Sequence, residues 1–171
     1  MSVAADLAYR YGDRNGFQRS VASFFASRPG AWLGKWLVPL FDDAVLKLTS
    51  GKSTISDWFG GLPPLWLTTT GAKTGEQRRH PLFGFPVGDH LAVIGSNFGQ
   101  ARHPAWVYNL EAHPDATVEY QGTAIPVVGR SATEDEAAEV WKEAALVYPG
   151  YSKYRRRAQH REIRVFILEA H

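Results

Sequence analysis

The chain has 171 residues, of which 44% are hydrophobic and 21% are charged, and these proportions are typical of a folded domain rather than of a disordered chain. Its formal net charge is only +2, so no overall positive field marks it as a nucleic-acid-binding protein, and no nucleic-acid partner is expected. The absence of cysteine excludes disulfides, zinc–thiolate sites and thiol nucleophiles, and it fits a cytoplasmic protein.

Residues 1–61 are predicted to be mainly helical and to form an N-terminal helical extension. Aromatic and aliphatic residues recur at helical spacing over residues 17–25 and again over residues 32–48. The pattern then changes, and residues 62–171 are predicted to form one further domain.

The longest apolar stretch of this extension, residues 32–41, is too short to span a bilayer and contains Lys35 and Pro39. The opening residues carry charges where a signal peptide needs an apolar core. Two interpretations of residues 31–48 remain open: helices that cover a core, or an amphipathic face that contacts a membrane surface.

Short strands separated by turns are predicted from Leu65 onward. Their predicted ranges are 65–70, 80–86, 91–96, 116–120, 124–130 and 163–169. Six short strands in a mostly antiparallel order, with inserted helices, predict an α+β fold built on a small barrel rather than a doubly wound sheet.

Two helices are predicted between these strands. Pro104 suits the first turn of one helix, and Pro114 ends it. Thr133 and Glu136 have the spacing of a capping box at the start of the other.

Several familiar motifs are absent. The stretch SGKS at residues 50–53 lacks the glycine that a phosphate-binding loop needs, because position 46 is leucine. None of the six histidines pairs at helical spacing with a nearby carboxylate, so no metal site is expected. No G-x-S-x-G nucleophile elbow is present, which argues against a serine hydrolase.

The stretch LTTTGAKTGEQRRHPL, residues 67–82, carries more positive charge than a hairpin turn needs. Gly71 and Gly75 allow close approach of the backbone to a ligand, and their amides are predicted to form an anion-binding nest. If the strand that follows alternates, Arg78 and His80 share one face and Arg79 takes the other. Two interpretations stay open here: a solvated turn with ordinary surface cations, or a site for phosphate or carboxylate.

A second candidate segment is GSNFGQARHPAWVYNL, residues 95–110. A strand ends there in small and amide residues, and a helix begins near Pro104. Such a loop offers backbone amides and the positive end of a helix to an anion or to a polar ring edge. Trp106 is either a wall for a planar ligand or a core residue, and the sequence favours neither.

A third segment, residues 147–164, combines aromatic residues with a basic cluster. Its tyrosines recur every three residues, at Tyr148, Tyr151 and Tyr154. Tyrosines at this spacing are either half-buried packing residues or, beside a basic patch, an aromatic wall for a planar anionic ligand.

These segments together resemble the deazaflavin-dependent nitroreductase family, mainly actinobacterial proteins that bind coenzyme F420. The resemblance rests on LTTTGAKTGEQRRHPL, GSNFGQARHPAWVYNL, HPDATVEYQG, VYPGYSKY and REIRVFILE, which follow one another in collinear order. It implies that residues 62–171 form a split β-barrel, deazaflavin-binding domain.

The family's G-x-K-T-G-x-x-R motif maps onto Gly71, Lys73, Thr74, Gly75 and Arg78. The resemblance implies that the lysine and the arginine meet the phosphate and the glutamyl tail of the coenzyme. This tail is strongly anionic, which explains the charge of the turn.

Other positions carry further implications. Ser96 matches a serine near the deazaflavin ring, whereas Asn97 stands where several relatives have lysine. His80 replaces a threonine that is common before Pro81. Near the end, His160-Arg161 replaces a frequent Asp-Arg and Arg164 a frequent proline, which implies an acceptor side that differs from the better-known nitroreductases.

The residues and the resemblance together predict two groups of functional side chains. The coenzyme is predicted to be held by Lys73, Thr74, Gly75, Arg78, Arg79, His80, Pro81, Gly95, Ser96, Asn97, Phe98, Gly99, Gln100, Trp106 and Asn109. The reaction and the acceptor are predicted to involve Ser96, Tyr148, Tyr151 and Tyr154.

The resemblance implies that reduced coenzyme F420 gives a hydride to a small electron-poor acceptor, such as a quinone, an activated alkene or a nitroaromatic. The coenzyme carries the chemistry, the protein orients it, and one tyrosine is predicted to donate a proton. The alternatives are FMN as the cofactor, a non-catalytic F420 carrier or sensor, and a peripheral lipid-binding protein. Split barrels often pair, so a homodimer is a further expectation.

Overall fold

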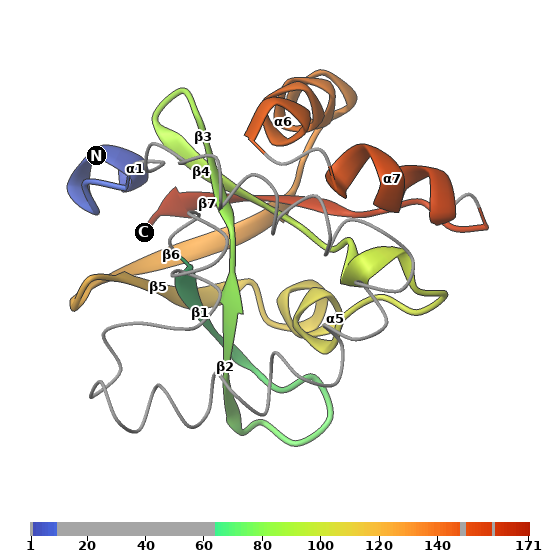
Figure 1. The fold of residues 1–171 in the computed structure, drawn as a ribbon. Coiled ribbons are helices and arrows are strands. Elements are labelled where there is room, and N and C mark those ends of the chain that lie inside the picture. The colour runs from blue at the N-terminus through green and yellow to red at the C-terminus, as the bar shows by residue number, and fades with distance from the viewer. Residues whose placement is uncertain (1, 10–63, 148–149, 159) are drawn as a thin grey trace, which may run out of the picture.

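The computed structural model describes residues 2–9, 64–147, 150–158 and 160–171 (Figure 1). The helices predicted over residues 17–25 and 32–48 therefore lie outside the described residues. The strands are β1 (Leu65–Thr70), β2 (Gln77–Leu82), β3 (Gly84–Val87), β4 (His90–Ile94), β5 (Asp115–Tyr120), β6 (Thr123–Ser131) and β7 (Val165–Ala170). The helices are α1 (Val3–Asp6), η1 (Asn97–Gly99), α5 (Ala105–Ala112), α6 (Glu134–Val147) and α7 (Gly150–Arg157).

The strands form one curled antiparallel sheet in the order β2-β1-β5-β6-β7-β4-β3. β2 and β3 follow each other directly in sequence, yet they lie at opposite ends of this order. The sheet must therefore curl to bring its two ends together along residues 77–87, and this curled half-barrel with helices belongs to the predicted α+β class.

The structure has seven strands where the sequence predicted six, because the predicted strand 80–86 is two strands. Leu82 pairs with Leu65 of β1, whereas Gly84 already pairs with Val93 of β4. A side chain at Gly84 would have its Cβ 2.4 Å from Leu65 Cδ2, so only glycine fits this corner. The change of partner strand leaves no periodic signal in the sequence.

Two hydrophobic clusters lie on the two sides of the sheet. One fills the inside of the curl and includes side chains from β1, β5 and α5, together with Val3, Leu7 and Tyr9. The other lies between the β3-β4-β7 part of the sheet and the covering helices α6 and α7 (Figure 1). Successive residues of β4 alternate between the clusters, so both of its faces are buried, which explains its continuous apolar sequence.

Both helices predicted between the strands are confirmed. α5 follows Pro104 and ends before Pro114, and α6 begins with the predicted capping box. The Thr133 amide donates to the Glu136 carboxylate at 2.8 Å, and the Glu136 amide donates to Thr133 Oγ1 at 3.3 Å. No helix in the described ranges is long and apolar enough to cross a membrane.

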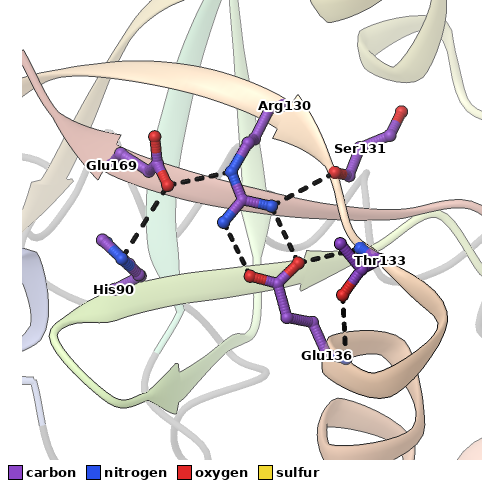
Figure 2. Close-up of polar contacts among 6 residues, drawn as sticks. All are labelled: His90, Arg130, Ser131, Thr133, Glu136 and Glu169. Carbon is purple, nitrogen blue, oxygen red and sulfur yellow. Dashed lines mark hydrogen bonds and ion pairs between the residues drawn. The ribbon is translucent and has the colours of Figure 1, made fainter.

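An ion-pair network fixes α6 to the sheet (Figure 2). Arg130 of β6 donates to both Glu136 oxygens, at 2.7 and 2.6 Å, and to Glu169 of β7 at 2.8 Å. These hydrogen bonds, with that from the Thr133 amide, lower the pKa of Glu136 to about 2. The carboxylate thus joins the cap of α6 to two strands.

The turn between β1 and β2 is held against α5 by one buried amide. Asn109 Oδ1 accepts from the Ala72 amide, and Asn109 Nδ2 donates to Thr69 Oγ1, both at 3.0 Å. Thr69 and Asn109 are both buried. A buried polar pair is stabilising only while each group keeps its partner, so the position of the turn depends on Asn109.

Replacement Glu136→Gln is expected to lower the free energy of unfolding by about 1 kcal/mol at neutral pH, through loss of a charged cap and ion pair. Because the pKa of Glu136 is depressed, the wild-type advantage is complete above the pKa of an unfolded glutamate, about 4.3. It is lost as the pH falls toward about 2. Urea unfolding over a pH series measures it, with the exposed Glu139→Gln as control. A pH-independent difference between wild type and Glu136→Gln would contradict the role of the charge.

Replacement Asn109→Ala is expected to cost about 2–3 kcal/mol, because it leaves the Ala72 amide without its acceptor and removes the donor to Thr69 Oγ1. Gln77→Ala is the matched control, since Gln77 Nε2 donates to Thr70 Oγ1 at the same 3.0 Å but at the surface. Its cost is expected to stay within about 0.5 kcal/mol. Equal costs for the two variants in urea unfolding would show that the buried bond does not fix the turn.

Candidate functional site

The turn at residues 71–76 uses much of its own backbone for internal hydrogen bonds. The Gly71 amide donates to Glu76 O and the Gly75 amide to Gly71 O, both at 2.8 Å. Gly75 has φ +70°, a conformation that favours glycine. The prediction that these two glycine amides form an anion-binding nest is therefore wrong. The charge that this turn offers to an anion comes from side chains, first of all from the exposed Lys73.

Strand β2 places its two arginines on opposite faces, as the predicted alternation requires. Arg78 pairs in register with the buried Thr69, and His80 pairs with the buried Leu67. Arg79 lies on the other face, where its guanidinium stands 4.2 Å from the centroid of the Trp66 ring. It also donates to Glu119 at 2.9 Å. Arg79 is thus held away from Arg78 and His80.

Arg78 and His80 have the properties of ligand-binding groups. The Arg78 side chain is 53% exposed and is paired with Glu76, which is itself exposed. Burial, and then the positive charge of Arg78, lower the pKa of His80, so its imidazole is held neutral. His80 Nε2 is buried and has no hydrogen-bond partner among the described residues. Such an atom is stabilised when a bound ligand supplies the partner.

Other predicted residues of β2 and of the turn have structural contacts. Thr74 Oγ1 accepts from the Glu76 amide at 3.3 Å and closes the turn. Pro81 pairs in register with Trp66, so strand alternation places it on the same face as Arg79.

The segment 95–103 follows β4 and is tightly bent. Asn97 and Gly99 both have positive φ, +43° and +77°, and Asn97 Nδ2 donates to Arg102 O at 2.9 Å. The Gly95 amide donates to Arg164 O at 2.9 Å. A Cβ at Gly95 would lie 2.8 Å from Val107 Cγ2, so this glycine allows the close packing of β4 on α5. The side chain of Phe98 lies outside the described residues.

Arg161 holds this segment from the far side and was not among the predicted site residues. Its guanidinium donates to Gln100 O and Ser96 O, both at 2.9 Å, and to Gly95 O at 3.3 Å. It also contacts His103 Nδ1 at 3.1 Å. Residues 147–164 contain six lysines and arginines, and their sequence does not show which of them has a structural role. The partners of Arg161 are backbone carbonyls some sixty positions away, which leave no local pattern.

Trp106 and Asn109 are core residues of α5. The Trp106 ring is buried and meets Phe166 edge-on at 5.9 Å between ring centroids. The amide of Asn109 is engaged with Ala72 and Thr69. Both residues support the segments on either side of them, and this placement favours the core interpretation of Trp106.

The tyrosines of α7 lie beneath the helix, against the sheet. Tyr151 and Tyr154 are 6% and 4% exposed, and their rings meet at 6.0 Å. Tyr151 also contacts Phe85 at 5.3 Å and Trp141 at 6.3 Å. The two rings are therefore packing residues of the outer cluster, as one of the two sequence interpretations had it. Tyr148 lies outside the described residues.

Each of the three predicted segments is connected to α5 or to η1. The turn 71–76 is bonded to α5 through Asn109, the segment 95–103 leads directly into α5, and α7 packs against η1. Together these segments and the adjoining strand β2 supply exposed cations, a neutral histidine and a loop that is fixed by internal hydrogen bonds. Within the described part of the chain no three metal-binding side chains are grouped to hold a metal ion.

Comparisons with known proteins agree with this picture. A family model described as "F420H(2)-dependent quinone reductase" matches residues 43–170. An F420H(2)-dependent quinone reductase of Mycobacterium tuberculosis is 39% identical over 77 residues, which cover 44% of this chain and 50% of that protein. The chain thus spans about half the length of the curated relatives that it matches.

Two solved structures are similar over most of their own length. An F420-H2 dependent reductase (FDR-A) shares 34% identity at a TM-score of 0.57, covering 63% of this chain and 94% of that one. A structure described as a domain-swapped dimer shares 29% identity at a TM-score of 0.59, covering 82% and 99%. The family model alone matches well over half of the residues, and the chain belongs to the F420H(2)-dependent quinone reductase family.

Proposed function

We propose that the protein transfers a hydride from reduced coenzyme F420 to a small electron-poor acceptor of the quinone type. The observation that carries this proposal is the combination of exposed cations, Lys73 and Arg78, with a His80 Nε2 that has no partner among the described residues, in a member of this family. Bound F420 supplies the hydride, and the protein supplies binding, orientation and exclusion of water.

Lys73 and Arg78 would hold the anionic phosphate and glutamyl tail of the coenzyme. Arg78 is paired only with exposed Glu76 among the described residues, and such a solvated pair costs little to exchange for a phosphate. Arg79 is left out of the proposed site, because Trp66 and Glu119 hold it on the opposite face of β2. His80 Nε2 would gain its missing hydrogen bond from the coenzyme.

The ring of the coenzyme would lie against residues 95–100. Ser96, Asn97, Gly99 and Gln100 are partly exposed there, and their backbone is fixed by internal bonds and by Arg161. A rigid loop orients a planar ring at little entropic cost, because the loop is ordered before the ligand arrives.

The acceptor would lie beside α7, which packs against η1. Tyr148, Tyr151 and Tyr154 are proposed to shape that side of the site, and one of them to give the proton that completes reduction. Tyr151 and Tyr154 keep only 6% and 4% of their residue surface exposed, and they would reach the acceptor from this edge of the outer cluster.

We further propose that the protein works in the cytoplasm and as a homodimer. Support for the dimer is the similarity to a structure described as a domain-swapped dimer.

Replacements Lys73→Ala and Arg78→Ala are each expected to weaken F420 binding about tenfold or more, because each removes a charge-assisted contact with the tail. Arg79→Ala removes the same charge from the other face and is expected to change the dissociation constant less than about threefold. Fluorescence-quenching titration with F420, and with FMN in parallel, measures these effects.

Equal loss of F420 affinity in Lys73→Ala, Arg78→Ala and Arg79→Ala would show that the coenzyme is attracted by overall charge and not held at a defined site. Binding of FMN but not of F420 by the wild-type protein would overturn the proposed cofactor, and unchanged affinity in Lys73→Ala and Arg78→Ala would remove the turn from the site.

Replacement Tyr151→Phe is expected to lower turnover by about a hundredfold while F420 affinity stays nearly constant, if its hydroxyl serves proton transfer at the acceptor. Tyr120→Phe is the control, since Tyr120 is a buried tyrosine of β5 inside the curl. Steady-state reduction of a soluble quinone measures kcat and KM. A loss of F420 affinity without loss of turnover would move Tyr151 into the coenzyme site.

A further inference from the structure

Arg161 makes four hydrogen-bond contacts, all with one short segment. Its Nε donates to Gln100 O, and its Nη2 donates to both Ser96 O and Gly95 O. Its Nη1 lies 3.1 Å from His103 Nδ1. These acceptors span residues 95–103, from the end of β4 to the residue before the N-cap of α5. One planar side chain therefore fixes the whole connection.

The contact with His103 determines which imidazole nitrogen carries the proton. A guanidinium has only donors, so His103 Nδ1 must accept, and the proton of the neutral ring must sit on Nε2. Burial, and then the positive charges of Arg161 and Arg164, lower the pKa of His103. Arg164 is itself paired with Glu111, and the Tyr108 ring meets the His103 ring edge-on at 5.8 Å.

Arginine is suited to this position and lysine is not. Three backbone carbonyls and a ring nitrogen are satisfied at once because the guanidinium presents donors in a fixed planar fork. An ammonium group is a point charge that cannot reach all four acceptors. Partial burial, which lowers the pKa of Arg161, also disfavours its charge, and the four acceptors offset that cost.

We propose that Arg161 is a positioning residue, which holds residues 95–103 in shape and presents His103 as a neutral hydrogen-bond donor through Nε2. The fixed shape of residues 95–103 and the tautomer of His103 are properties of the free protein. Donation from His103 to a ligand rests on the proposed function, in which the coenzyme ring lies against this segment. His103 is then a donor to a carbonyl or ring nitrogen of the ligand.

The tautomer is tested without any ligand. Long-range proton–nitrogen NMR spectra of the wild-type protein at neutral pH are expected to show His103 protonated at Nε2 and free at Nδ1. In Arg161→Lys the two tautomers are expected to mix, because the fixed donor to Nδ1 is lost, while Arg156→Lys on α7 leaves the spectrum unchanged. A wild-type signal from protonated Nδ1 would overturn the proposal.

The positioning role is tested by rescue. Arg161→Ala is expected to bind F420 about tenfold more weakly and to reduce a quinone about tenfold more slowly at saturating coenzyme. Millimolar guanidinium chloride is expected to restore both, whereas sodium chloride at the same ionic strength is not. Arg156→Ala, which removes an exposed cation from α7, is expected to show neither the loss nor the rescue.

The outcomes separate this proposal from the proposed function. If the wild-type protein binds no F420, the proposed function fails, and the NMR result still decides the role of Arg161. If F420 binds but Arg161→Lys and Arg161→Ala retain full affinity, turnover and tautomer, Arg161 does not position the segment. Circular dichroism of each variant reports folding. If Arg161→Ala does not fold, both the NMR tautomer and the F420 affinity and turnover are measured on Arg161→Lys.

Discussion

The structure depends on one backbone segment, residues 77–87, which forms the strands at both ends of the same sheet. Its first half is bonded to β1 and its second half to β4, with the corner at Gly84, where the neighbouring Leu65 leaves no room for a side chain. This closure creates the inside of the curl. It also fixes which face of β2 points into the curl. A shift of the β1–β2 register by one residue would place Arg79 on that face in place of Arg78 and His80. The charge at the candidate site is thus a consequence of strand register.

Around this curled sheet, α5 connects the parts of the site. Asn109 holds the β1–β2 turn on one side of the helix, and Arg161 holds the segment that leads into it. Neither side chain is proposed to react. Each satisfies backbone groups that have no place in a strand or helix ladder, which is how irregular segments are kept rigid enough to bind a planar ligand. The candidate site is rigid because its supports are polar and specific.

Sequence periodicity was sufficient for the α+β class, for most strand positions, for the capping box at Thr133 and for the alternation of Arg78 and Arg79. Local patterns carry that information. The division of the predicted strand 80–86 and the role of Arg161 depend on partners distant in sequence. The Gly71 amide is used by Glu76 of its own turn, in a hydrogen bond that the glycine spacing does not reveal. Gly84 is one glycine among sixteen, and only the approach of Leu65 gives it meaning. The resemblance supplied the ligand, which charge alone describes only as an anion.

The place of β7 in the sheet has a consequence for synthesis of the protein. This strand lies between β6 and β4 and pairs with both, so neither has its partner on that side until residues 165–170 have left the ribosome. Until then the apolar strand β4 exposes an unpaired edge, and α1, which packs on β4 and β7, lacks half of its docking surface. Such edges are prone to aggregation. The nascent chain is therefore most prone to aggregation just before β7 emerges. A chaperone that covers strand edges is expected to have its largest effect at this stage.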